Sequence, residues 1–161
     1  MPADVTRFED LYSTYAPAIH RFVFRLSGGD TALAEDITAE TFLRVWTAKD
    51  RVRAATVQAY LFAIARNLFL EGFRRERKRE PLTDAAALVR QPDAVLRGDI
   101  ERAIAGLAET DRAALLLRVE EEMPYEEIAA VLAISPAAAR VKVHRARTKV
   151  AAALGGREVN R

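Results

Sequence analysis

The chain has 161 residues, no cysteine, two histidines and a formal net charge of only +2 at pH 7. The absence of cysteine excludes disulfides and thiolate ligands, and two histidines argue against a histidine-based metal cluster. No apolar run reaches the roughly 18 residues that span a membrane, and the N-terminus lacks the pattern of a signal peptide. We therefore expect a cytoplasmic protein without membrane insertion, metal or cofactor.

The N-terminal part of the chain predicts three helices. Apolar residues recur every three or four positions over residues 6–26, which is typical of an amphipathic helix. The turn SGGD follows, and its Asp30 is placed to cap a second helix that reaches about residue 49. That helix carries a second apolar stripe, Phe42 and Trp46, which we expect to be exposed. A third helix begins near residue 56 and ends in the basic sequence RRERKRE.

Residues 80–97 predict a flexible linker, because Pro81 and Pro92 interrupt them and aromatic residues are absent. No alternating strand pattern is present anywhere in the chain. The sequence therefore predicts an all-α fold of two small helical domains, residues 6–79 and residues 98–154.

The C-terminal domain predicts a helix-turn-helix. The helical segments DIERAIAGLA and ETDRAALLLRVEEE come first, the second with Thr110 or Asp111 as its expected cap. PYEEIAAVLA is then followed by a short turn and a last helix. Ser135 is placed to cap that last helix, and Pro136 suits its first position.

Charge is sorted sharply between neighbouring segments of this domain. Residues 120–127 read EEEMPYEE, whereas residues 134–150 contain five bases and no acid. At about 100° per residue, Ala139, Val143, Ala146 and Val150 form one packed stripe. The opposite face has small side chains at its centre and basic side chains at its edges, which suits binding in a major groove. Its expected DNA contacts are Arg140, Val141, His144 and Arg145, with Lys149 reaching only a phosphate. We expect the acidic segment to face solvent or another protein.

The third helix interleaves aromatic and basic residues, a pattern that suits single-stranded nucleic acid. Spacing places most of its aromatic rings in the core. The polar and basic residues that interleave with these rings are Arg66, Asn67, Arg74 and Arg75. No catalytic constellation or phosphate-binding glycine loop is present, so we expect a protein that is not an enzyme.

Three segments together resemble the extracytoplasmic-function group of bacterial RNA polymerase sigma factors. They are FEDLYSTYAPAIHRFVFRLSGGDTALAEDITAETFLRVW, AYLFAIARNLFLEGFRR and LAETDRAALLLRVEEEMPYEEIAAVLAISPAAARVKVHRARTKV. The resemblance covers about residues 6–154 in family order. It implies a protein that binds the clamp and flap faces of core RNA polymerase and directs initiation at specific promoters. It also implies promoter DNA as a partner, and an anti-sigma protein as a common one.

The resemblance assigns roles residue by residue. On the helix that grips the polymerase clamp, the matching positions are Asp36, Glu40, Phe42, Val45 and Trp46. Asn67, Arg74 and Arg75, with the loop over residues 49–56, match the region that captures the melted proximal element. Arg140, Val141, His144 and Arg145 match the face that reads the distal element as duplex.

The sequence also departs from the family pattern. Ala137, Ala138 and Val141 lie in a segment that often reads Gly-Thr-Val-Lys-Ser in the family, and Ala39 and Tyr60 replace a common Gln and Trp. Two alternatives remain open at this point. One is a stand-alone helix-turn-helix regulator that dimerises through its N-terminal domain. The other is a helical module that sequesters a partner without reading DNA.

Overall fold

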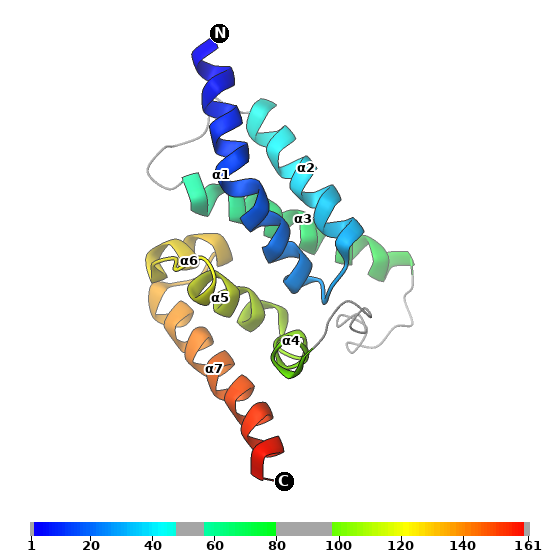
Figure 1. The fold of residues 1–161 in the computed structure, drawn as a ribbon, viewed down its shortest axis with the longest axis vertical. Coiled ribbons are helices and arrows are strands. Elements are labelled where there is room, and N and C mark those ends of the chain that lie inside the picture. The colour runs from blue at the N-terminus through cyan, green and yellow to red at the C-terminus, as the bar shows by residue number, and fades with distance from the viewer. Residues whose placement is uncertain (1, 48–56, 80–97, 160–161) are drawn as a thin grey trace.

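The computed structural model describes residues 2–47, 57–79 and 98–159, and the regular secondary structure within them is helical (Figure 1). The predicted linker and the predicted loop over residues 49–56 lie outside the described residues. The N-terminal domain contains α1 (Pro2–Leu26), α2 (Thr31–Thr47) and α3 (Val57–Arg79). The C-terminal domain contains α4 (Asp99–Ala105), α5 (Glu109–Val119), α6 (Tyr125–Leu132) and α7 (Pro136–Val159). The all-α prediction is confirmed.

In the N-terminal domain, α1 and α2 lie side by side and α3 crosses them (Figure 1). The turn between α1 and α2 needs Gly28 and Gly29, whose φ angles are 76° and 101°, in the region that glycine adopts most easily. Asp30 Oδ1 accepts a hydrogen bond from the Leu33 backbone N–H at 3.0 Å, which confirms the predicted cap. Aromatic rings fill the core, where Phe22 and Phe62 pack edge to face with centroids 5.2 Å apart.

The predicted helix-turn-helix is formed by α6 and α7. Ser135 Oγ accepts a hydrogen bond from the Ala138 backbone N–H at 3.1 Å, and α7 begins at Pro136, so both start signals are confirmed. The turn passes through Ala133 in the left-handed conformation, with φ 56°. The helix extends to Val159, beyond the boundary at residue 154 that the sequence predicted.

The predicted side-chain cap of α5 is wrong. This helix begins at Glu109, after Ala108, and has no side-chain cap hydrogen bond. Asp111 lies within its first turn and directs its carboxylate to α7. A contact to a cationic partner far along the chain therefore replaces the local contact that the sequence suggested.

The two domains pack against each other, with α3 on α6 and α1 on α4 and α5. Arg66 of α3 donates two hydrogen bonds to the Glu109 carboxylate, at 3.0 and 2.7 Å. The buried Arg112 donates to the backbone carbonyl of Leu26 in α1. These contacts join the start of α5 to the N-terminal domain.

The acidic segment does not face solvent or another protein throughout, as the sequence suggested. Its first two residues face α1 of the same chain, where Arg21 contacts Glu120 at 3.0 Å and Glu121 at 2.9 Å. Arg25 lies 2.9 Å from Glu120. Part of the charge sorting therefore serves the contact between the domains.

Candidate nucleic-acid interface and partner groove

The last helix, α7, has a packed face and an exposed face, as its sequence predicted. Ala139, Val143 and Ala146 are at most 1% exposed and pack in the core of the C-terminal domain. On the other side Val141 is 59% exposed. We define the reading face as the exposed residues opposite the packed stripe, Ala137, Val141, His144 and Thr148, with the exposed Arg140 and Arg145 on its two flanks. It offers small and apolar groups at its centre, which allow close approach to base edges.

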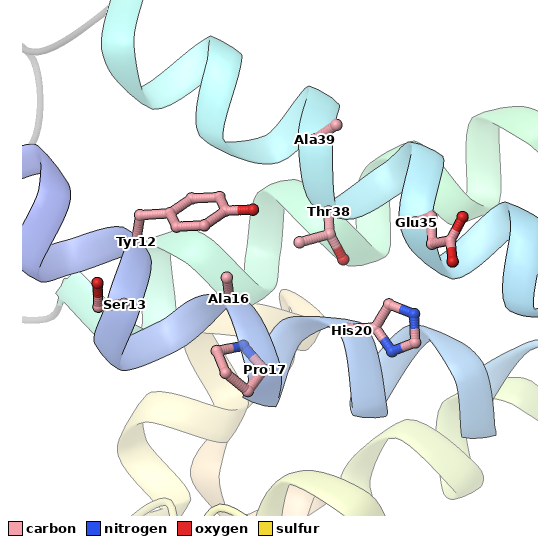
Figure 2. Close-up of a pocket in the computed structure, with 8 residues that line it drawn as sticks. All are labelled: Tyr12, Ser13, Ala16, Pro17, His20, Glu35, Thr38 and Ala39. Atoms are coloured by element: carbon pink, nitrogen blue, oxygen red, sulfur yellow. The ribbon is translucent and has the colours of Figure 1, made fainter.

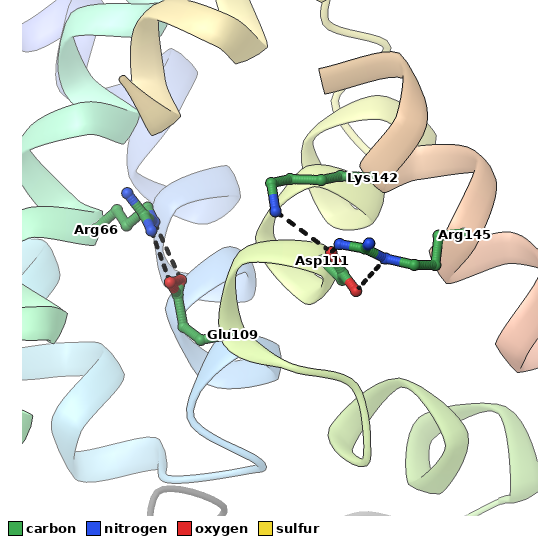
Figure 3. A network of polar contacts seen from close by, with 5 residues as sticks. All are labelled: Arg66, Glu109, Asp111, Lys142 and Arg145. Carbon is green, nitrogen blue, oxygen red and sulfur yellow. Dashed lines mark hydrogen bonds and ion pairs between the residues drawn. The ribbon is translucent and has the colours of Figure 1, made fainter. Parts of the chain in front are cut away.

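One flank of α7 is tied to a buried carboxylate (Figure 3). Arg145 donates from Nε and Nη2 to the two carboxylate oxygens of Asp111, at 3.1 and 2.9 Å. Lys142 Nζ lies 3.8 Å from the same carboxylate, whose side chain is only 3% exposed. The Arg145 hydrogen bonds hold the pKa of Asp111 below its ordinary value, despite its burial, and raise the pKa of Arg145. Two of the five bases in this helix segment are therefore engaged within the domain.

The other flank of α7 rests on an aromatic ring. The guanidinium carbon of Arg140 lies 5.2 Å from the centroid of the Tyr125 ring in α6. Arg118 of α5 lies 4.6 Å from the same centroid. A cation over the face of an aromatic ring is attracted electrostatically, without using its N–H groups in hydrogen bonds to a carboxylate. The Tyr125 ring therefore positions Arg140, and the N–H donors of Arg140 remain available.

The predicted contacts to a melted strand lie on the exposed side of α3. Asn67, Arg74 and Arg75 are exposed. Asn67 and Arg74 share one helix face, about 10 Å apart along the axis at 1.5 Å per residue. Arg75 lies 3.8 Å from Glu71, and both side chains are well exposed, so this weak pair leaves the arginine available. The helix offers a short cationic strip to a phosphate backbone.

The exposed aromatic stripe predicted on α2 is only half correct. Phe42 is 2% exposed, because Phe8 and Tyr12 of α1 pack their rings on it with centroids 6.3 and 4.9 Å away. Val45 is also buried, at 4%. Neither side chain is available to a partner in this structure. Trp46, which is 39% exposed and packs edge to face against Phe8, remains on the surface.

The outer face of α2 gains a residue that the sequence analysis missed. Leu43 is 55% exposed and lies three positions before Trp46. By the 3.6-residue period it shares a face with Asp36 and Glu40, within about 60°. Glu40 also pairs with Arg44 at 3.3 Å, on the surface. The spacing of Leu43 and Trp46 was the signal in the sequence, since positions i and i+3 are neighbours on a helix.

A groove of about 440 Å³ lies between α1 and α2 (Figure 2). Its walls are Tyr12, Ser13, Ala16, Pro17 and His20 from α1, and Glu35, Thr38 and Ala39 from α2. Small residues leave space between the two helices, and Tyr12 and Glu35 lie toward opposite ends of the groove in Figure 2. The Thr38 hydroxyl donates to the Ala34 carbonyl, so it presents no unsatisfied donor to the groove. The groove therefore combines apolar wall residues, Ala16, Pro17 and Ala39, with the polar side chains of Ser13, His20 and Glu35.

The described residues contain no cluster of three or more histidine or acidic side chains that could hold a metal ion. None of their helices is long and apolar enough to cross a membrane.

Comparison with known proteins assigns both domains. Residues 11–79 match the family described as Sigma-70 region 2, and residues 97–150 match Sigma-70, region 4. The sigma factor EcfG of Rhodopseudomonas palustris, named as an ECF RNA polymerase sigma factor, is 30% identical, over 96% of this chain and 88% of EcfG. The chain belongs to the extracytoplasmic-function group of RNA polymerase sigma factors. The resemblance seen in the sequence is confirmed, and this sigma factor is of the class that directs transcription initiation by RNA polymerase.

Other relatives of the sigma factor align over nearly its whole length. RNA polymerase sigma factor CarQ of Myxococcus xanthus is 33% identical, over 94% of this chain and 91% of CarQ. ECF sigma factor SigE of Mycolicibacterium smegmatis is 31% identical over 92% of this chain, but the chain spans only 62% of the length of SigE.

Two solved structures share the fold of the sigma factor. One is the sigma factor RpoE in complex with the anti-sigma factor NepR from Bartonella quintana, with a TM-score of 0.81 at 23% identity, over 92% of this chain and 97% of that one. The other is CnrH in complex with the cytosolic domain of CnrY, with a TM-score of 0.69 at 24% identity, over 92% and 88%. At these identities the likeness concerns the fold.

Proposed function

We propose that this sigma factor binds core RNA polymerase and recognises promoters in two ways. It reads the distal element as duplex with α7 and captures the melted proximal element with α3. The observation that carries the proposal is the presence of two separate cationic surfaces on one chain, beside an exposed apolar face on α2. In this role the protein is a transcription regulator rather than a catalyst, and it acts in the cytoplasm.

The reading face of α7 suits a major groove. Its centre, at Val141 and His144, is exposed and modest in size, so the helix can approach base edges. Val141 can contact a thymine methyl group, and Arg140 can pair with guanine. Ala137 and Ala138 have no hydroxyl, so this part of the helix reads by shape and apolar contact.

The surface of α3 suits a single strand. Arg74 and Arg75 can pair with phosphates, and the Asn67 amide can contact an unstacked base. Two of the four aromatic rings of α3, Phe62 and Phe69, are at most 1% exposed and belong to the core. Tyr60 and Phe73 are only partly buried, and Tyr60, seven positions before Asn67, shares its helix face, so stacking of bases on α3 falls to Tyr60.

We assign the contact with polymerase to the outer face of α2 and the neighbouring groove. Leu43 and Trp46 supply exposed apolar area, and Asp36 and Glu40 supply charge around it. Aromatic residues surrounded by polar groups are typical of binding hot spots. Phe42 and Val45 support this face from beneath and do not contact the partner. An anti-sigma partner is also proposed, since RpoE, which shares the fold, was solved with the anti-sigma factor NepR.

The test is run-off transcription with purified core polymerase and a library of random promoters. We expect transcripts to start at a restricted set of sequences only when this protein is added. A stand-alone regulator would bind duplex without core polymerase and would start no transcripts. A module that only sequesters a partner would do neither. Transcription no greater than that of core polymerase alone would reject the proposed function.

A further inference from the structure

We propose that Asp111 is a positioning residue for promoter reading, because it holds Arg145 on the flank of α7 and keeps it from reading bases. Base recognition then falls to Arg140, Val141 and His144. This inference rests on the proposed reading of duplex DNA by α7. It changes the role that the sequence gave to Arg145, which family resemblance placed among the readers.

The first argument is the direction of the Arg145 side chain. Its Nε and Nη2 groups point to Asp111 in α5, as Figure 3 shows, so the guanidinium lies along the domain surface. The pair is bidentate, which fixes the plane of the guanidinium as well as its position. A side chain held in this way links α7 to α5 and fixes the position of one helix relative to the other.

The second argument is what Arg145 would leave behind if it turned toward a base. The Asp111 side chain is 3% exposed, so water cannot replace the two lost hydrogen bonds. Lys142, at 3.8 Å, would remain close to the carboxylate, and Lys149 would act on it electrostatically, but neither makes the two hydrogen bonds that Arg145 makes. A buried carboxylate without good hydrogen bonds is strongly disfavoured. The resting geometry is therefore also the favoured one on DNA.

The third argument is the contrast with Arg140 on the opposite flank. Arg140 is exposed, and its guanidinium carbon lies over the Tyr125 ring rather than beside a carboxylate of the described residues. The five N–H donors of Arg140 therefore stay available for a bidentate contact with guanine. Arg145 therefore stabilises the packing of α7 on α5, whereas Arg140 is available to contact DNA.

The experiment uses holoenzyme formed with full-length protein and measures binding to promoters with single-base changes in the distal element, at several salt concentrations. Asp111→Asn releases Arg145 and Lys142, which then reach phosphates. We expect the salt dependence to steepen by about one unit per new phosphate contact. We also expect several-fold weaker discrimination between bases. The control is Glu126→Gln, which also replaces a carboxylate with an amide but lies at an exposed position on α6. We expect it to leave the salt dependence and the discrimination between bases unchanged.

Two arginine variants make the test independent of how well Asp111→Asn folds. Arg145→Ala lowers binding to all base variants by one common factor, since it acts through the position of α7. Arg140→Ala narrows discrimination at one or two base positions by roughly 5- to 150-fold. Far-UV circular dichroism confirms that each variant is helical.

The outcomes separate this inference from the function beneath it. If unmodified holoenzyme does not discriminate between base variants, duplex reading by α7 is itself rejected. If it discriminates, but Arg145→Ala loses preference at particular bases, Arg145 is a reader and the inference is overturned. Behaviour of Asp111→Asn identical to that of Glu126→Gln overturns it as well.

Discussion

Replacing Glu109 with alanine should destabilise the protein more than replacing its partner, although both changes break the same contact between the domains. Arg66 is 8% exposed and donates two hydrogen bonds to the Glu109 carboxylate, at 3.0 and 2.7 Å. The Glu109 side chain is 23% exposed. The cost of each substitution depends on which charge is left without a partner.

The magnitudes follow from that difference in burial. Breaking a fully buried ion pair by removing one partner costs about 3–5 kcal/mol. Water can reach the site vacated by Glu109, so we expect about 2–3 kcal/mol of lost unfolding free energy for Glu109→Ala. In Arg66→Met the remaining carboxylate is partly hydrated and the aliphatic stem is kept, so we expect about 1 kcal/mol.

The assay is urea unfolding, monitored by far-UV circular dichroism and by fluorescence of Trp46, the single tryptophan in the chain. Trp46 reports on the N-terminal domain and circular dichroism on both domains. In the unmodified protein we expect the two transitions to coincide, since the domains are packed together. In Glu109→Ala we expect them to separate. The double variant completes a thermodynamic cycle, in which contacting residues show non-additive effects.

The matched control is Glu126→Ala, which removes the same side chain from an exposed position in α6. We expect it to change the unfolding free energy by less than about 0.5 kcal/mol. A loss for Glu109→Ala no greater than this would show that the pair does not stabilise the domain contact. A larger loss for Arg66→Met than for Glu109→Ala would refute the burial argument.

Ala133→Gly should raise the unfolding free energy by about 0.5–1 kcal/mol, because alanine is strained at φ 56° and glycine is not. Chemical denaturation measures this difference. The pKa of Asp111 is lowered mainly by the Arg145 hydrogen bonds, so the stabilisation they give is present above its ordinary value of 3.8 and is lost as pH falls through the lower folded-state value. Melting temperatures of Asp111→Asn should therefore fall less on acidification than those of the unmodified protein. Leu43→Ala with Trp46→Ala should weaken capture of core polymerase roughly 30-fold, the equivalent of about 2 kcal/mol at a hot spot.

Each of these expectations has its own control. Ala130→Gly, at an exposed position inside α6, should lower stability by about 1 kcal/mol, so a loss of similar size in Ala133→Gly would contradict the strain argument. Glu126→Gln should keep the acid sensitivity of the unmodified protein. Glu9→Gln, at an exposed position on α1, should leave capture of core polymerase unchanged. Undiminished capture by a folded Leu43/Trp46 double variant would move the polymerase contact away from α2.

Features that depend on a few neighbouring residues were predictable from the sequence. The apolar period gave the helices, and Asp30 and Ser135 act as the caps that their positions indicated. The packed stripe of α7 was also predicted, because helical period alone decides which side chains share a face. The order of motifs along the chain was enough to indicate the sigma factor family.

Only the tertiary structure decided which of these side chains are available to a partner. Phe42 lies on the expected stripe of α2, but α1 covers it with Phe8 and Tyr12. Arg145 lies on an outward flank of α7, yet it is paired with Asp111, which is 34 positions away in the chain. Helical period and capping act within about four residues, so they fix where a side chain leaves its own helix. Whether a ring is covered or a charge is paired depends on segments that meet only when the domains fold and pack.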